Sequence, residues 1–328
     1  MLRLERSARL AFMLLILAAG SYGEFALAEI DGLGADGWHT WQVEALDGAP
    51  EMCCFSWKNG KAAQKQCDLD QRNGGFSSSD RSSPNDGVQI YALMEAGTVD
   101  RVRAFSTSCP VVSDSEIIDL GRIETKASVD WLQPLIGGDA SSNAIAAIAV
   151  HEGATARNVL LGSAKVGNDE EIREEAIFWM AQVRVDETGD EIKRYVFNDP
   201  SAAIREHAAF AYSQSRAVDI ADTLIRQGKN YREPDVRSHA WFWLAQTEAV
   251  ESETAIRNAM LNDEDDDVRE EAVFALSQLP EDRAVKALAS ILEDKALEMD
   301  IREQALFWLA QTESDEAFEY IDRLLSDN

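Results

Sequence analysis

Positively charged side chains are scarce in this chain. Its 31 Lys and Arg stand against 59 Asp and Glu, which gives a formal net charge of −28. Such a charge repels the phosphates of nucleic acids and the headgroups of anionic lipids. The composition therefore argues against a nucleic-acid-binding protein and favours a protein or peptide partner that is basic or neutral.

Long apolar runs are absent beyond the N-terminus. A helix needs about 18 apolar residues to cross a bilayer, and no segment after residue 28 approaches that length. Within residues 1–28, three arginines precede a short apolar stretch that ends in Ala-Leu-Ala at 26–28. This order is typical of a secretory signal peptide. We expect cleavage there and export, most simply to a bacterial periplasm, with an uncleaved anchor as the alternative.

Histidine is rare, and the common catalytic motifs are missing. The chain has four His, and it contains no GxSxG, HExxH or P-loop string and no GxGxxG between a strand and a helix. We therefore predict that the protein is not an enzyme and that it holds no cofactor.

The four cysteines all lie in the N-terminal part, at Cys53, Cys54, Cys67 and Cys109. An even number of Cys in an exported chain predicts disulfides, and adjacent Cys rarely bond to each other because the ring is strained. Cys53 and Cys54 are thus expected to pair separately with Cys67 and Cys109, in either order. A metal site is the competing interpretation, which the lack of CxxC spacing disfavours.

Residues 29–127 are predicted to form a small, mostly β domain with these disulfides. Asn59-Gly60 and the segment 95–98 have the composition of hairpin turns. The segment 73–86 is rich in Ser, Gly and Asn and is expected to be an exposed loop. Strands are predicted at 38–44, 53–58, 88–93 and 99–105.

The remaining part, residues 129–328, contains a repeat. Five segments share the order Arg, two residues, Ala, one residue, Phe, three residues, Gln. A constant period of this length predicts a solenoid, in which each unit buries its apolar side against its neighbours. Each unit has room for an amphipathic helix and a helix that carries the motif, and a degenerate unit begins near residue 141. The arginines follow one another at intervals of 32, 32, 32 and 33 residues, at Arg173, Arg205, Arg237, Arg269 and Arg302.

The strings Asp235-Val236-Arg237, Asp267-Val268-Arg269 and Asp300-Ile301-Arg302 resemble HEAT repeats, specifically the short type of the phycobilisome lyases. The resemblance covers residues 130–326 and implies an α-solenoid of about six helix pairs. It implies that the five arginines tie successive repeats together, so we assign them a structural role.

This resemblance says little about function, because the fold serves many tasks. HEAT-repeat deoxyhypusine hydroxylases hold two irons with several His-Glu pairs, whereas this chain has one pair in that order, His151-Glu152. A protein- or peptide-binding scaffold is therefore the favoured function. The alternative is a disulfide- or metal-dependent activity of Cys53 and Cys54, with the solenoid as a docking arm.

A helical wheel of the motif separates two sides. The residues one before, three after and seven after the Arg are expected to face the amphipathic helix. The Phe and the Gln fall roughly opposite, where they could line a groove for an extended peptide or pack between neighbouring helices. Both interpretations remain open. These residues are Phe178, Phe210, Phe242, Phe274 and Phe307, with Gln182, Gln214, Gln246, Gln278 and Gln311.

Positions that break the repeat are further candidates for contact with a partner. Trp241 replaces a small or aliphatic residue, and His207 and His239 replace Glu one repeat apart. The two His could line one site or simply face solvent. The residue after the Phe alternates between Trp and Ala, which predicts interlocking of neighbouring helices.

Overall fold

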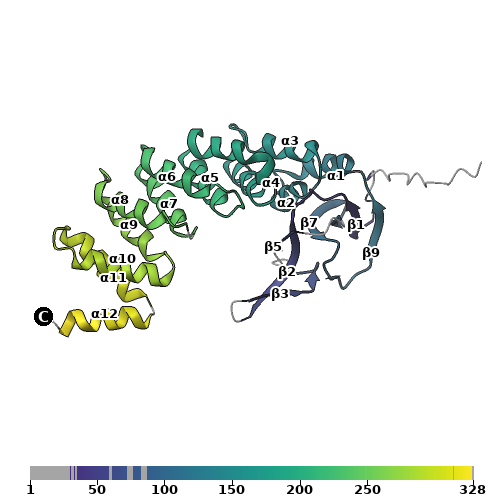
Figure 1. The fold of residues 1–328 in the computed structure, drawn as a ribbon. Coiled ribbons are helices and arrows are strands. Elements are labelled where there is room, and N and C mark those ends of the chain that lie inside the picture. The colour runs from purple at the N-terminus through teal and green to yellow at the C-terminus, as the bar shows by residue number, and fades with distance from the viewer. Residues whose placement is uncertain are drawn as a thin grey trace, which may run out of the picture.

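The computed structural model describes residues 30, 33, 35–58, 61–71, 77–82, 87–247, 249–312 and 314–326. A β module is followed by a curved row of paired helices (Figure 1). An α-solenoid preceded by a small, disulfide-bonded β region is thus confirmed as the architecture. The predicted signal peptide and the Asn59-Gly60 turn lie outside the described residues.

The described residues of the β module form three small sheets. The largest has the strand order β7-β6-β1-β9, in which β1 and β9 are parallel and the other pairs antiparallel. The second has the order β3-β2-β5, and β4 and β8 form a parallel pair. The described strands are β1 (Gly37–Val43), β2 (Pro50–Lys58), β3 (Lys61–Lys65), β4 (Cys67–Asp68), β5 (Ser77–Ser82), β6 (Val88–Glu95), β7 (Thr98–Ser106), β8 (Val111–Val112) and β9 (Ile117–Arg122).

Two sequence predictions in this region have different outcomes. The β6–β7 hairpin is confirmed, and its turn places Ala96 at φ 50° and Gly97 at φ 78°, the left-handed pair that a tight hairpin turn requires. The prediction of a loop over 73–86 is wrong at Ser77–Ser82, where β5 pairs antiparallel with β2; the rest of that segment lies outside the described residues. Backbone pairing offered by β2 outweighs the weak strand preference of a Ser-rich segment.

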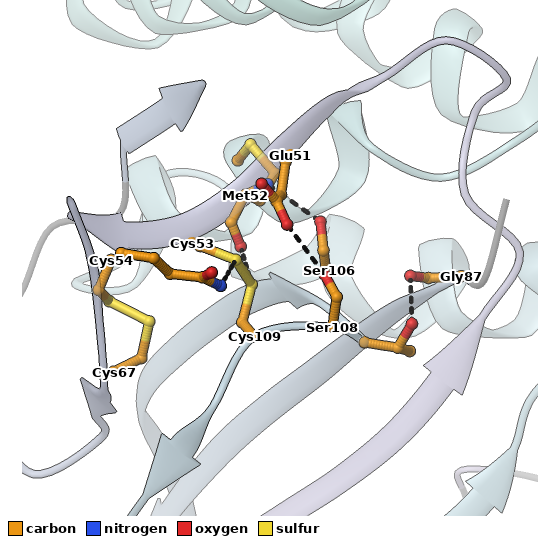
Figure 2. The surroundings of a disulfide bond; sticks show 11 residues. Glu51, Met52, Cys53, Cys54, Cys67, Gly87, Ser106, Ser108 and Cys109 are labelled. Atoms are coloured by element: carbon orange, nitrogen blue, oxygen red, sulfur yellow. Dashed lines mark hydrogen bonds between the residues drawn. A yellow bond between two sulfur atoms is a disulfide. The ribbon is translucent and has the colours of Figure 1, made fainter. Parts of the chain in front are cut away.

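Two disulfides fix β2 to the rest of the module (Figure 2). Cys53 is bonded to Cys109, and Cys54 to Cys67. Adjacent residues of a strand point to opposite faces, so each Cys reaches a different partner. The predicted separate pairing is confirmed, and the structure decides its order. A hydrogen bond of 3.0 Å from the Met52 amide to Ser106 Oγ joins β2 to β7 beside the first bond.

We expect the two disulfides to differ in their contribution to stability. They close loops of 56 and 13 residues, and chain entropy predicts about 4 kcal/mol for the longer loop and about 3 kcal/mol for the shorter one. Urea unfolding of the double variants Cys53→Ala/Cys109→Ala and Cys54→Ala/Cys67→Ala measures both. A larger loss of unfolding free energy in Cys54→Ala/Cys67→Ala than in Cys53→Ala/Cys109→Ala would contradict this ranking.

The helical part begins with α1 (Thr125–Leu132), the 3₁₀ turn η1 (Gln133–Leu135), α2 (Ser141–Ala149) and α3 (Ala154–Ser163). The long helix α4 (Glu170–Asn198) breaks at Arg184, where φ is −120° and ψ is 22°. Its first half carries the motif, and its second half is the amphipathic helix of the next repeat. The following motif helices are α5 (Ala202–Ser213), α7 (Pro234–Ala245), α9 (Asp266–Ser277) and α11 (Met299–Gln311), and the amphipathic helices are α6 (Ile220–Asn230), α8 (Ser252–Asn262), α10 (Glu281–Glu293) and α12 (Asp315–Ser326).

Each motif helix packs its predicted side against an amphipathic helix and lies beside the motif helices of its neighbours. In α7, Val236, Ala240 and Leu244 are fully buried, and they stand one before, three after and seven after the Arg. Arg237, Trp241 and Ala245 are buried as well. The burial of the first three agrees with the wheel assignment. Successive motif helices contact one another in the order α5, α7, α9 and α11.

The β module and the solenoid share one hydrophobic core. Trp41 and Ile90 of the large sheet belong to the same buried cluster as Ile145 and Ile148 of α2 and Met180 of α4. Because apolar side chains of both parts are buried together, their burial stabilises the junction as well as each part.

A buried chain of hydrogen bonds crosses this junction. Trp41 Nε1 donates to Ser128 Oγ at 2.8 Å, and Ser128 Oγ lies 2.7 Å from His151 Nε2. His151 Nδ1 lies 2.7 Å from the carbonyl of Ala147, and a carbonyl can only accept, so Nδ1 carries the proton. The neutral ring thus satisfies both neighbours, and burial lowers the pKa of His151 to about 4.

We expect this His to make the fold acid-sensitive. The pKa of His151 is lowered from 6.5 to about 4, so as pH falls the unfolded chain takes up a proton before the folded one does. Stability should therefore drop between about pH 6.5 and 4, by about 3 kcal/mol for this group. Unfolding measured across this range should show a shallower slope for His151→Gln.

Other titratable groups also change the stability with pH and must be separated from His151. Burial also lowers the pKa of His207, so part of the slope should persist in the variant. The pKa values of Asp70 and Asp219 are lowered by their hydrogen bonds, and their contribution is lost below this window. An unchanged slope in His151→Gln would refute the assignment.

Candidate protein-interaction surface

Eight aromatic rings form an unbroken series across the five motif helices. We call this series the aromatic ladder, and each ring contacts the next at a centroid distance between 4.5 and 6.0 Å. Such contacts are within the range in which aromatic pairs attract beyond simple burial. In spatial order the ladder is Trp179, Phe178, Phe210, Trp243, Phe242, Phe274, Trp308 and Phe307.

The alternation of Trp and Ala in the sequence explains how the ladder continues. Where the residue after the Phe is Ala, the Phe stacks on the Phe of the preceding repeat, as Phe210 does on Phe178 at 6.0 Å. Where it is Trp, the Trp contacts the preceding Phe, as Trp243 does with Phe210 at 4.7 Å. Every second repeat therefore supplies two rings to the ladder, and the repeats between them supply one.

The ladder is both packed and accessible. Phe178, Phe210, Phe242 and Phe274 are half-buried, so each has one part between neighbouring helices and another at the surface. Phe307 is 52% exposed, since no further motif helix of the described chain lies beyond α11. The two interpretations of the Phe residues are therefore compatible with one geometry. The three Trp residues of the ladder belong to the same surface. The alternation of Trp with Ala after each Phe is the sequence pattern by which they could have been found.

The repeated Gln residues lie at the C-terminal ends of the motif helices. Gln214, Gln246 and Gln311 are exposed and Gln278 is half-buried. Gln214 and Gln278 each donate a hydrogen bond to the Ser that precedes them, at 3.2 and 3.1 Å. These bonds stay within one helix end, so the amides border the ladder without joining successive repeats.

His207 and His239 each face the preceding repeat. His239 Nδ1 lies 3.4 Å from Glu206 Oε2, and His207 lies beside Glu174, whose charge opposes the lowering of the His207 pKa by burial. Gln304 continues this row with a contact of 3.5 Å to Glu270. The two His therefore belong to a polar row beside the ladder and do not meet at one site.

Two pockets open along the ladder. The first, of about 610 Å³, lies between α7 and α9 and has Phe242, Trp243 and Phe274 in its lining. The second, of about 460 Å³, lies between α9 and α11 and includes Phe307. Carboxylates line both, and we call the ladder together with these two pockets the ladder face. The acidic residues of the pockets are Asp235, Asp267, Glu270 and Glu271 in the first and Glu270, Asp300 and Glu303 in the second.

The five arginines lie elsewhere, at the N-terminal ends of the motif helices. Arg237 makes two bonds to Asp263, of 2.9 and 2.7 Å, and also donates to the Tyr231 carbonyl at 2.9 Å. In the same way Arg173 pairs with Asp199, Arg205 with Glu233 at 2.9 Å, and Arg269 with Glu298 at 3.2 Å. Arg302 donates to the Leu292 carbonyl at 3.4 Å. Four arginines thus join one repeat to the next.

The period, the paired helices and the arginine contacts agree with a comparison to known families. Residues 221–305 match the family model described as HEAT repeats. Residues 221–305 of this chain are built of HEAT repeats. Such repeats indicate a protein-interaction scaffold.

The other comparisons add little. No curated protein matches the chain. Among solved structures, that of human deoxyhypusine hydroxylase in complex with glycerol is similar at 16% identity, covering 60% of this chain and 77% of that one, with a TM-score of 0.26. That score is too low to support an argument. Within the described residues, no helix is long and apolar enough to cross a membrane.

One candidate, Trp241, does not lie on the ladder face. It is 2% exposed and packs in the HEAT repeat against Gly228 of α6. A Cβ on Gly228 would come within 2.5 Å of the Trp241 ring. The large side chain at this position is therefore explained by a facing Gly and not by a partner, and the sequence prediction of a contact residue is corrected.

We expect Gly228→Ala to destabilise the HEAT repeats by about 1–3 kcal/mol, because the added methyl group overpacks the Trp241 ring. Gly162→Ala in α3 is the matched control, since nothing lies within 4 Å of its Cβ and Ala favours a helix by about 1 kcal/mol. Thermal unfolding measures both variants. If Gly228→Ala were as stable as Gly162→Ala, the close packing at Trp241 would be refuted.

The cysteines of the β module are not available for chemistry in this state. All four are buried and bonded, so none presents a thiolate to a metal or a substrate. No cluster of three or more His, Cys, Asp or Glu that could hold a metal occurs among the described residues. The geometry therefore offers the alternative activity of Cys53 and Cys54 no support.

Proposed function

We propose that this protein is a scaffold that binds an extended segment of a partner protein along the ladder face. The observation that carries the proposal is the continuity of the aromatic ladder, because rings of five successive repeats contact one another and remain partly accessible. A surface of this kind suits a partner that contacts several repeats at once.

The chemistry of the ladder face also suits a polypeptide. Aromatic side chains supply contact area at a low entropy cost and are enriched where proteins bind each other. Exposed amides of Gln214, Gln246 and Gln311 at its border offer donors and acceptors to a peptide backbone. An extended segment could therefore combine apolar contacts with backbone hydrogen bonds.

We further infer that binding takes place in an exported compartment, in bacteria the periplasm. The N-terminal sequence has the order of a signal peptide, and two buried disulfides are consistent with an oxidising environment. The proposed scaffold would then act on other exported proteins.

Site-specific photocrosslinking in cells that make the protein tests this function. A photoreactive residue at His239 or Phe307, both exposed on the ladder face, is expected to yield a crosslinked protein. The same residue at Val218, which is fully exposed and absent from the two pockets, is the control. Phe307→Ala should reduce the crosslink from His239 several-fold, since it removes an accessible ring. Equal yields of crosslinked protein from all three positions would show that the ladder face is not the binding surface.

A further inference from the structure

Two sets of carboxylates in the solenoid differ in their partners. The first set lies before the motif helices and pairs with arginines, at Asp199, Glu233, Asp263 and Glu298. Those in the two pockets of the ladder face make no ion pair with any Lys or Arg in the described part of the chain. Four arginines therefore join the repeats, while the pockets keep the negative charge of their carboxylates.

The two pockets repeat the same chemistry one unit apart. Each combines carboxylates with an aromatic ring: Glu270 lies one helical turn from Phe274 in the first, and Glu303 lies one turn from Phe307 in the second. Glu270 lines both. A carboxylate next to an aromatic face is suited to a Lys or Arg side chain, which gains from the charge and from the cation–π contact.

The spacing of the pockets constrains the conformation of a ligand. Neighbouring helices pack with their axes about 8–10 Å apart, so equivalent pockets recur at about that distance. A polyproline II segment rises about 3.1 Å per residue and returns to the same side every third residue. One turn therefore advances about 9 Å and would bring side chains three residues apart to successive pockets.

We propose that the ladder face binds a basic segment in the polyproline II conformation, with Lys or Arg at every third residue and one such side chain in each pocket. This inference rests on the proposed function and specifies the partner for the same surface. The net charge of −28 adds a long-range attraction that speeds association without selecting the spacing.

Fluorescence anisotropy with labelled peptides tests the spacing. One peptide repeats Arg-Pro-Ser, and a second has the same composition with its arginines consecutive. A third replaces every Arg of the first with Glu. We expect the first to bind at physiological salt, the second to bind about three-fold or more weakly, and the third not to bind.

Charge-matched variants test the site. Glu270→Gln removes the carboxylate that both pockets share and should weaken the first peptide about three-fold. Glu281→Gln makes the same charge change on the exposed start of α10 and should leave the affinity unchanged. Circular dichroism checks that both variants fold.

The outcomes separate this inference from the function that it rests on. Equal binding of the two Arg peptides, or an equal loss in Glu270→Gln and Glu281→Gln, would reveal general charge attraction and overturn the inference. If photocrosslinking from the ladder face captures a partner through an acidic or apolar segment, the inference falls while the scaffold function stands. If the crosslinks from the ladder face match the Val218 control and the first peptide does not bind, both are wrong.

Discussion

Each motif helix of the solenoid is held in place by its packing against the next. A single helix pair cannot bury its apolar side alone, so every repeat relies on its neighbours. Two sets of contacts hold the motif helices in line. The arginines bond to the loop of the following repeat at one end, and the aromatic rings stack along the middle. The surface proposed to bind a partner is thus made of residues that also hold the solenoid together.

The ring surface can serve both packing and binding because aromatic rings, unlike buried charged groups, need no hydrogen-bond partners. Arg237 is almost fully buried but has a carboxylate and two carbonyls around its guanidinium group, which offsets the cost of removing the charge from water. The rings need no such partners and can remain half-buried. A strongly acidic chain with few cations therefore commits its arginines to structure and retains negative charge along the accessible aromatic surface.

The β module precedes the first repeats in the chain and also stabilises them. Its sheet shares a buried cluster with α2 and α4, and Arg184 donates to the carbonyls of Ala149, His151 and Gly153 at the break in α4. The atypical start of the solenoid is thereby covered, as the terminal unit of a repeat array must be. The opposite end has no equivalent cover within the described residues, and Phe307 and Phe318 are exposed there.

The period, the solenoid, the buried side of each motif helix and the four disulfide cysteines could be predicted from the sequence, because they depend on local spacing and on composition. The sequence could not order the disulfides, detect β5, or distinguish the buried Trp241 from the accessible Trp243. It also could not show that rings of different repeats touch or that the pocket carboxylates lack cations. These points required the folded chain, because each depends on which side chains from distant positions meet. A facing Gly228 or an adjacent strand leaves no periodic pattern in the sequence.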